Sequence, residues 1–400
     1  MRNNTSQSRW LNRNVLLISF SAFFADSGYQ AIISGIPLFL VMALKAPAYY
    51  FGLAMAVGYG GGALTGFLGG KLSDRYNKKI IVVTGNILIT FLSFIGFTTV
   101  PSLVIMLFVL GWWSRNFRSP ARRALFSDSV IREKRGKAFG FLHALDIGGG
   151  FVSSIYFIIL LFYHVPFKYI FLVSFPLLII STFLIVFVDE KHAAGIEEAR
   201  LNEPRNTEKL KKSEKYKHST FIGILIATAL YGFSSFSLGF PVLTIAQRHG
   251  YIIGIGGYAL LSIVSSFAGL YIGGSMARAV GKLSILGYLF AAAGSLVIGY
   301  AYTENFGILI FYAGAVILGV SMGVIETLEP ALISLIAKEK EIGLEMGSLT
   351  AARSIGLFTG NIIMGLLYTI SPLSSYEYVA AVAVVSGILM LILGRNYKNA

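Results

Sequence analysis

The stretch GGKLSDRYNKKI (69–80) has a second, weaker copy in GGSMARAVGKLS (273–284). In both, two glycines at the end of an apolar run precede a short turn that carries basic residues. Two further pairs of stretches align in the same order: SPARRALFSD with EPALISLIAK, at Pro120 and Pro330, and 135–149 with 342–356. This repetition predicts two halves of related structure.

Long apolar runs surround these turns. The 400-residue chain is 55% hydrophobic and 13% charged, with a mean hydropathy of +0.72, whereas a soluble domain is typically about one-quarter charged. Runs of the length that crosses a bilayer, about 17–25 residues, recur twelve times. They lie near 14–41, 48–70, 80–100, 102–121, 137–163, 167–188, 219–246, 251–275, 283–302, 305–327, 343–370 and 376–394. The first is too long for a signal peptide and lacks a clear cleavage site, so we expect an uncleaved span.

The basic residues are distributed unevenly between the two sides of the membrane. The formal net charge is +14, and 27 of the 33 Lys and Arg fall in segments expected on the same side as the N-terminus. Segments on the other side hold three, Lys45, Lys168 and Arg248. Because basic segments stay in the cytoplasm, we expect both termini there, in a multi-pass protein of the inner, or plasma, membrane. The lipid bilayer is the expected partner of these charges, and nucleic acid is not.

One internal segment is polar enough to separate two domains. The stretch 189–218, DEKHAAGIEEARLNEPRNTEKLKKSEKYKH, divides the spans six and six. We expect an N-terminal six-helix half (1–188), a cytoplasmic loop that serves as a solvated linker (189–218) and a C-terminal six-helix half (219–400). Duplicated six-span units are typical of secondary transporters, whose substrate site lies near the midplane between the halves.

The first copy of the turn resembles a known signature. Its pattern, Gly70-x-Leu72-x-Asp74-Arg75-x-Asn77-Lys78-Lys79, is similar to that of the major facilitator superfamily between helices 2 and 3. Asn77 replaces the usual glycine, and we expect it to keep the turn because asparagine tolerates a left-handed backbone. In the second copy, Arg278 replaces Asp74. The resemblance implies an all-α membrane protein with twelve transmembrane helices in two pseudo-symmetric six-helix halves, and a cavity lined by helices 1, 4, 7 and 10.

The resemblance also implies a gating cluster at the cytoplasmic surface. The motif supplies Gly70, Asp74, Arg75 and Lys78, and Asp128 is the acid available at the end of helix 4. We expect Asp74, Lys78 and Asp128 to latch the outward-open state and to separate when the halves move.

Glycines form a stripe on the second span. They recur every fourth residue, at Gly58, Gly62, Gly66 and Gly70. Small residues at this spacing line one helical face and let backbones approach closely in lipid. The stripe predicts ordinary close packing and is also compatible with a smooth surface on which the halves move.

The sequence contains none of the motifs that the common enzyme classes need. It has no cysteine for a thiol nucleophile or zinc cluster, and neither HExxH nor GxSxG occurs. The Gly-rich stretches at 58–63 and 254–259 lie in apolar runs with no preceding strand, so they do not predict a dinucleotide site. We therefore expect no enzyme activity, no catalytic residues, no metal site and no cofactor.

Few ionisable residues fall within the spans, where they are costly and often functional. They are Asp26 on span 1, Arg115 and Arg118 on span 4, His143 and Asp146 on span 5, Glu326 and Glu329 on span 10 and Arg353 on span 11. In the alignment of the halves, Arg118 falls one position from Glu329, and Asp146 matches Arg353. We expect Asp146 to pair with Arg118 or Arg115, and Arg353 with Glu329 or Glu326. Static links between helices and a role in transport are both open.

Asp26 and Glu326 are the candidates to carry a proton. Burial disfavours the charged form of a carboxyl group, which prepares it to bind a proton. The alternative for Asp26 is a static ion pair with Arg115 or Arg118. The residues expected to line the substrate cavity are Tyr29, Gln30, Arg115, Arg118, Tyr231, Ser234, Glu326 and Glu329.

These features predict a secondary active transporter that works by alternating access. The stretch 118–149 resembles a subgroup of prokaryotic exporters of the same family, so the preferred function is proton-coupled export of an amphiphilic compound by antiport. The exporter signature expects Gly-Pro on helix 5, where this chain has three glycines and Phe151. A metabolite importer or facilitator, by symport or uniport, is the second hypothesis, and a non-transporting membrane sensor is the third. We expect a monomer whose partners are a small-molecule substrate and protons.

Overall fold

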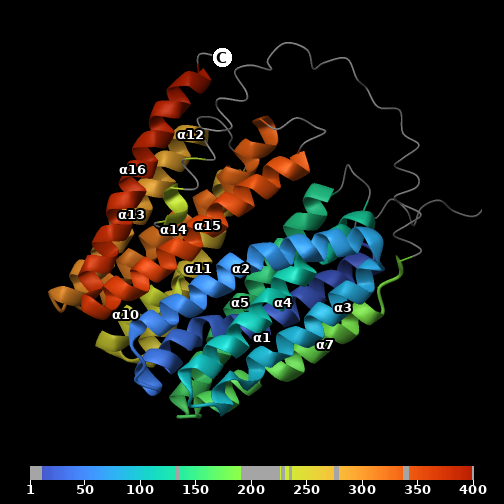
Figure 1. Cartoon of the computed structure of the whole chain (residues 1–400), viewed down its shortest axis with the longest axis horizontal. Coiled ribbons are helices and arrows are strands. Elements are labelled where there is room, and N and C mark those ends of the chain that lie inside the picture. The colour runs from blue at the N-terminus through green and yellow to red at the C-terminus, as the bar shows by residue number, and fades with distance from the viewer. Residues whose placement is uncertain are drawn as a thin grey trace, which may run out of the picture. The chain divides into compact units, whose positions relative to one another are not determined.

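The computed structural model describes residues 11–130, 135–190, 226, 230–233, 237–273, 279–336 and 342–398, and this part of the chain contains helices and turns but no strand (Figure 1). The first helices are α1 (Arg13–Pro37), the π-helical η1 (Leu38–Ala43), α2 (Ala48–Arg75), α3 (Lys78–Ile89), the 3-10 helix η2 (Thr90–Phe97), α4 (Pro101–Asp128), α5 (Arg135–Phe162), α6 (Phe167–Leu172) and α7 (Ser174–Val186). The later ones are α10 (Gly239–His249), α11 (Tyr251–Gly273), α12 (Ala279–Lys282), the π-helical η4 (Leu283–Leu289), α13 (Phe290–Thr303), α14 (Ile308–Ile336), α15 (Ile342–Ile370) and α16 (Pro372–Lys398). The predicted all-α architecture is confirmed.

Nine helices within the described residues are long and apolar enough to cross a membrane. α4 and α15 are 28 and 29 residues long, but polar side chains such as Arg118 and Arg353 lower their mean hydropathy and keep them out of this group. The predicted seventh span, 219–246, lies largely outside the described residues. A multi-pass membrane protein is therefore supported, and the count of twelve spans stays a prediction.

Contacts between Cα atoms divide the chain into two compact units. The first unit contains 1–33 and 61–208, and the second contains 34–60 and 209–400. The helical hairpin 34–60 thus packs with the later helices of the second unit. There the rings of Phe51 and Phe240 meet with centroids 4.8 Å apart. The boundaries expected from the sequence, 1–188 and 219–400, assign this hairpin to the other half.

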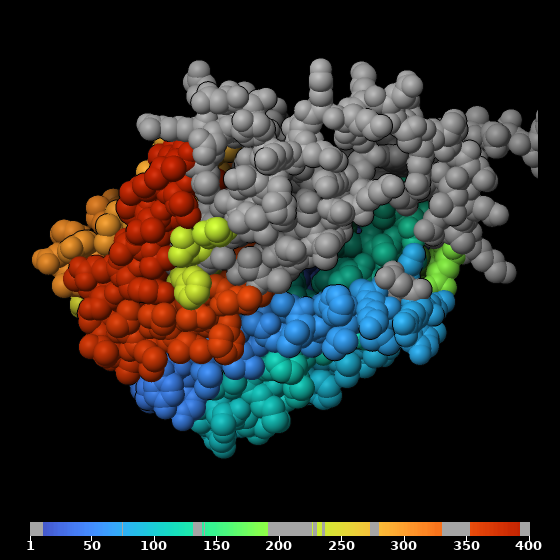
Figure 2. Space-filling view, turned by 45° about the horizontal axis from the view of Figure 1, so that its top comes forward, coloured from blue at the N-terminus to red at the C-terminus, as the bar shows by residue number. Residues whose placement is uncertain are grey.

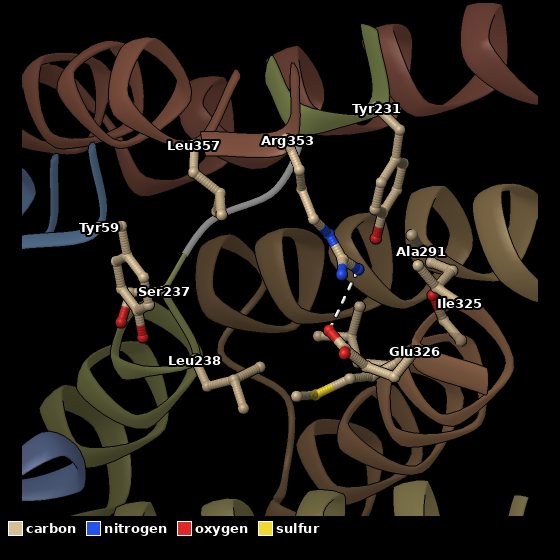
Figure 3. Close-up of a pocket in the computed structure, with 12 residues that line it drawn as sticks. Tyr59, Tyr231, Ser237, Leu238, Ala291, Ile325, Glu326, Arg353 and Leu357 are labelled. Atoms are coloured by element: carbon tan, nitrogen blue, oxygen red, sulfur yellow. Dashed lines mark ion pairs between the residues drawn. The ribbon is translucent and has the colours of Figure 1, made fainter. Parts of the chain in front are cut away.

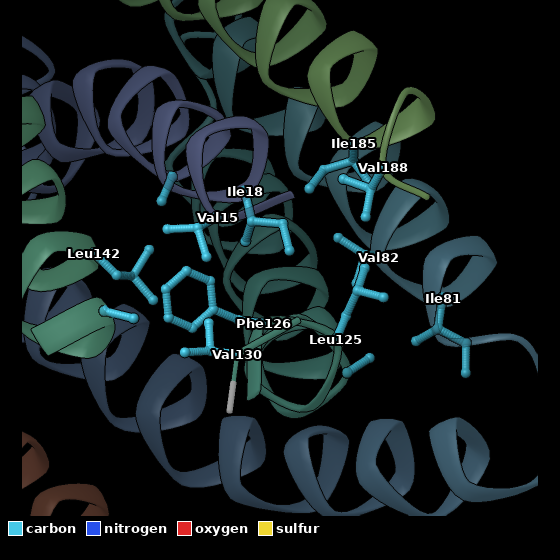
Figure 4. Close-up of a cluster of buried hydrophobic side chains, with 13 residues drawn as sticks. Val15, Ile18, Ile81, Val82, Leu125, Phe126, Val130, Leu142, Ile185 and Val188 are labelled. Carbon is cyan, nitrogen blue, oxygen red and sulfur yellow. The ribbon is translucent and has the colours of Figure 1, made fainter. Parts of the chain in front are cut away.

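The core of the first unit holds the ends of α1, α4 and α5 together (Figure 4). Val15 and Ile18 of α1 point toward Phe126 of α4 and are fully buried. The spacing of three residues on α1 places their side chains on one helical face. Leu142 of α5 and Val82 of α3 close the same cluster. This packing fixes the helices that carry the charged residues of the unit.

The glycine stripe of α2 faces α4 within the first unit. A Cβ at Gly62 would clash with the amide of Asn116, and one at Gly70 would lie 3.6 Å from Cβ of Pro120. Larger side chains at Gly62 would push the two helices apart. For these two glycines the structure shows close helix packing, the first of the two interpretations of the stripe.

Asn77 begins α3 rather than adopting a left-handed backbone. Its φ of −57° and ψ of 116° are not left-handed, and its Oδ1 accepts a hydrogen bond from the Ile80 N–H at 3.0 Å. The turn between α2 and α3 is kept, as expected, but the expected left-handed backbone was wrong, because asparagine here acts as the N-cap and satisfies a free amide of the first turn. The Asn77 side chain also donates to Glu190 at 2.5 Å, which ties the turn to the segment that follows α7.

In the second unit, α14 packs against α11 and α13, and α13 packs against α16. Close approach of α11 requires Gly319, where a Cβ would lie 2.7 Å from the carbonyl oxygen of Leu261. α16 forms an outer face of this unit, in red in Figure 2. Exposed apolar side chains on it, among them Val385 and Ile388, suit contact with lipid rather than water.

Candidate functional site

Asp26 is buried in the first unit, where α1 packs on α5. Its exposed fraction is 3%. The two helices approach closely because Gly149 has no side chain: a Cβ there would lie 2.5 Å from the carbonyl oxygen of Phe23 and 3.0 Å from Cβ of Asp26. The hydroxyl of Tyr29, one turn along α1, donates a hydrogen bond to Asp26 Oδ1. A buried carboxyl group is costly without such a partner, so this bond holds the group in place.

Asp146 on α5 pairs with Arg122 of α4. Its Oδ2 lies 3.7 Å from Arg122 Nη2, so the predicted pairing with Arg118 or Arg115 was wrong. This contact is longer than a direct hydrogen bond. Three buried atoms of the pair have no hydrogen-bond partner among the described residues: Nε and Nη1 of Arg122 and Oδ1 of Asp146.

Arg118 points toward α3 instead. Its side chain is 1% exposed, and its Nη1 donates to Oδ1 of Asn86. α3 and α4 come close at this level because a Cβ at Gly85 would lie 2.5 Å from Cβ of Arg118. The alignment of the halves did not indicate the side of α4 from which the guanidinium group of Arg118 extends.

Arg115, one turn before Arg118, contacts two aromatic rings. Its guanidinium carbon lies 4.7 Å from the ring centroid of Trp112 and 5.4 Å from that of Tyr29. Such cation–π contacts stabilise a partly desolvated cation by about 0.5–2 kcal/mol. Tyr29 thus contacts both this arginine and Asp26. Asp146 of α5 is a second hydrogen-bonding neighbour of Asp26.

The second unit holds a cluster of one arginine and two carboxylates, which has a net negative charge when all three are ionised. Arg353 of α15 lies 3.1 Å from Glu326 and 3.8 Å from Glu329, both on α14. Glu329 is fully buried and accepts a hydrogen bond from the Tyr288 hydroxyl at 2.6 Å. The ring of Tyr288 stacks on that of Tyr231, with centroids 4.5 Å apart. The structure thus brings Arg353 to both expected acids and adds two tyrosines.

Glu326 and Arg353 line a cavity of about 190 Å³ in this unit. Figure 3 shows Arg353 and Tyr231 pointing toward Glu326. Tyr59 lines the cavity at the left of the picture. The remaining lining residues are Ser237, Leu238, Ala291, Leu318, Ser321, Met322, Ile325 and Leu357. A mostly apolar wall with a few convergent polar groups is the usual composition of a small-molecule site.

Comparison with known proteins identifies the family. A model of the Major Facilitator Superfamily matches residues 18–308. The chain belongs to the Major Facilitator Superfamily. It is 23% identical to an uncharacterized MFS-type transporter of Methanocaldococcus jannaschii, over 98% of this chain and 97% of the relative. It is also 24% identical to the multi-drug resistance efflux pump PmrA of Streptococcus pneumoniae, over 59% of this chain and 58% of the pump.

A solved structure shows the same fold. The D-xylose–proton symporter is 13% identical to this chain, with a TM-score of 0.75 over 96% of this chain and 97% of the symporter. At this identity the likeness extends to the fold alone. Together with the family match, it confirms the major facilitator fold predicted from the repeated turn, and the protein is a membrane transporter of this superfamily.

The gating motif of this facilitator is partly described. Lys78 Nζ lies 2.6 Å from Asp128 Oδ2, with side chains 27% and 11% exposed. Gly70 packs near α4, and Arg75 is exposed. The side chain of Asp74 lies outside the part that the structure describes. The motif therefore links α3 to the end of α4, and its gating role stays a prediction.

We expect Lys78 and Asp128 to contribute about 1 kcal/mol of coupling to stability, the upper range for pairs that retain some solvent contact. The measurement is a double-mutant cycle with Lys78→Met and Asp128→Asn, followed by unfolding of the purified protein in mixed micelles. If the effects of the two substitutions on the free energy of unfolding add without a coupling energy, the contact between Lys78 and Asp128 does not stabilise the protein.

The other expected cavity residues divide between the two units. Gln30 is half-buried on α1, and a Cβ at Gly150 of α5 would lie 3.8 Å from its Cγ. Tyr231 lines the cavity beside Glu326. Ser234 lies outside the described residues.

Sequence reasoning missed several residues of these clusters. Arg122 was counted only among the basic residues expected on the cytoplasmic side, although it is 7% exposed and faces Asp146. Asn86, Tyr59 and Tyr288 received no role. The signal for Asn86 was an amide in the middle of an apolar span, while the two tyrosines had no feature that separated them from other tyrosines of the chain.

Proposed function

We propose that this facilitator moves a small amphiphilic molecule across the cytoplasmic membrane by alternating access and exports it in exchange for protons. The observation that carries the proposal is the burial of Asp26 in a membrane helix with a tyrosine as its hydrogen-bond partner. Ionisable groups at such positions are costly and usually belong to ion or substrate pathways. Asp26 is therefore the proposed proton carrier, and Glu326 is the alternative.

The loose geometry of the first cluster favours a role in transport over a static link. A structural ion pair in lipid is expected to use its buried donors and acceptors fully, because each unmade hydrogen bond is costly there. Arg122 and Asp146 are 3.7 Å apart and keep unpaired buried atoms among the described residues. Such a pair is suited to exchange partners during the transport cycle.

Export is favoured by one relative and by the exporter-like stretch 118–149. The similar protein PmrA is named a multi-drug resistance efflux pump. The second candidate, import by symport, has a fold neighbour in the D-xylose–proton symporter. The inner membrane, cytoplasmic termini and a monomeric state complete the proposal, on the asymmetry of basic residues and the six-plus-six arrangement of spans.

Proton flux in everted membrane vesicles tests the coupling. The vesicles are acidified by respiration, and ethidium (a cationic amphiphile) or deoxycholate (an anionic one) is added while the internal pH is followed. An antiporter that accepts one of these compounds releases protons from the vesicle when the compound is added. Uptake of a compound with no accompanying pH change, in vesicles that hold their gradient, would contradict proton antiport.

Alternating access makes a prediction for the contact between α2 and α15. A Cβ at Gly52 would lie 2.5 Å from the carbonyl oxygen of Asn361 and 2.8 Å from Cα of Gly365. Because overpacking costs about 1–3 kcal/mol, Gly52→Ala should shift the equilibrium toward the state in which these ends separate. Access to the cavity from outside should then increase about tenfold, since 1.4 kcal/mol corresponds to a factor of ten.

The absence of cysteine from the sequence makes this measurable directly. A single cysteine at Ser321, which lines the cavity, is labelled from outside intact cells with a membrane-impermeant maleimide. The matched control is Gly66→Ala on the same helix, where the new Cβ would meet only the Asn116 carbonyl oxygen at 3.6 Å. Equal labelling rates in the two variants would exclude the proposed opening at this contact.

A further inference from the structure

Arg353 is shared by two carboxylates that differ in accessibility. Glu326, 3.1 Å away, has a side chain that is 54% exposed, whereas Glu329, 3.8 Å away, is fully buried. The two acids are three residues apart on α14 and therefore reach the same side of the helix. With all three groups ionised, the cluster carries one negative charge in excess.

The two acids have different roles toward the arginine. Glu329 is held by the Tyr288 hydroxyl at 2.6 Å and lies away from solvent, so it remains beside Arg353 whatever occupies the cavity. Glu326 can leave Arg353 without depriving it of a counter-charge, because Glu329 stays. A buried cation that kept no carboxylate would be costly. Glu326 is thus the acid available to a second cation.

The surroundings of Glu326 suit an organic cation rather than a metal ion. The rings of Tyr59 and Tyr231 line the cavity with it, and most of the other lining side chains are apolar. Aromatic faces attract quaternary and protonated amines, most strongly where water is displaced. An anion would meet the excess negative charge of the cluster, and a neutral molecule that displaced water would leave this excess charge without a compensating cation.

We propose that this cavity binds organic cations, of the size of a one-ring ammonium compound, with Glu326 as their counter-charge and Glu329, held by its hydrogen bond from Tyr288, as the carboxylate that stays near Arg353. The inference rests on the proposed function only in treating the bound cation as cargo. It adds that the transported amphiphile is positively charged and that Glu326 selects for this charge.

Binding to the purified full-length protein in lipid nanodiscs tests the site. The probes are benzyltrimethylammonium, benzyl alcohol and benzylsulfonate, which share one ring and differ in charge, and affinity is measured by calorimetry. Wild type should bind the ammonium compound most tightly. Glu326→Gln should weaken that binding by about tenfold, the loss expected for a charge-assisted contact, with no gain for the other probes.

Two variants control for folding and for loss of charge alone. Glu377→Gln makes the same substitution at an exposed acid of α16 outside the cavity and should leave binding unchanged. Glu326→Asp keeps the charge and should retain the preference for the cation. Equal affinity of Glu326→Gln and wild type for benzyltrimethylammonium, or tighter binding of benzylsulfonate by wild type, would overturn the proposal.

The vesicle assay separates this inference from the proposed function. Proton release with deoxycholate but not with ethidium would leave proton-coupled export standing and refute the cation site. Binding of benzyltrimethylammonium that depends on Glu326, with no proton release by either amphiphile, would support the site and contradict proton antiport.

Discussion

Replacing Arg353 by methionine is expected to lower the free energy of unfolding by about 3–5 kcal/mol, the usual cost of removing one partner of a buried ion pair. The substitution leaves Glu329, which is fully buried, with the Tyr288 hydroxyl as its remaining described hydrogen-bond donor. Methionine replaces the aliphatic stem of arginine and lacks its guanidinium group, so the uncompensated carboxylate accounts for most of the effect.

The measurement is SDS-induced unfolding of the purified protein in mixed micelles. Glu326→Gln is the comparison, because it removes the partner of Arg353 that is 54% exposed, and pairs with solvent contact contribute about 1 kcal/mol or less. The double variant Arg353→Met with Glu329→Met removes both buried charges and should recover most of the lost stability. A single Arg353→Met variant as stable as wild type would show that Glu329 does not need this arginine.

The sequence predicted the fold and one group of neighbouring charged residues because these depend on features that lie along the chain. Apolar runs of bilayer length and the repeated turn are local patterns, and the alignment of the two halves transfers one position to its counterpart. In this way Arg353 was expected beside Glu326 and Glu329, and the structure brings the three together.

The direction in which a side chain points from its helix depends on the neighbouring helices, which come from distant parts of the sequence. Arg118 and Arg122 are one turn apart on α4, yet one reaches Asn86 of α3 and the other Asp146 of α5. The difference follows from where α3 and α5 approach α4, which Gly85 permits for α3. Periodicity within α4 cannot supply this information, since it describes one helix at a time.

At Asn77, two backbone conformations agree with the known preferences of asparagine. Asparagine is favoured both in left-handed turns and at helix N-termini. The family pattern, with glycine at this position, favoured the first. The structure has the second because α3 starts at Lys78, directly after it.

Replacing Asp26 by asparagine is expected to abolish proton-coupled uptake into everted vesicles while leaving exchange of the transported compound intact. Asparagine has nearly the same shape, and its Oδ1 can still accept the hydrogen bond that Tyr29 donates to Asp26. What it loses is the ability to bind and release a proton, because a carboxamide does not titrate. Antiport requires such a group, whereas exchange of one substrate molecule for another does not.

The experiment compares two assays on the same vesicles. Respiration-driven accumulation of ethidium reports coupled transport, and exchange of preloaded ethidium without a pH gradient reports the transport cycle itself. Asp26→Asn should reduce the first to the level of vesicles that lack the protein and retain the second. Ser19→Ala, a substitution of another buried polar residue on α1, serves as the matched control and should retain both.

The two carboxylates proposed as proton carriers give opposite patterns in these assays. If Asp26 carries the proton and Glu326 binds the cation, Asp26→Asn loses coupling alone, while Glu326→Gln weakens accumulation and exchange together because less ethidium is bound. Coupled accumulation that survives Asp26→Asn but fails in Glu326→Gln, with exchange retained, would assign the proton to Glu326. The charge network around Asp26 would then be a link between α1, α4 and α5 rather than part of the proton pathway.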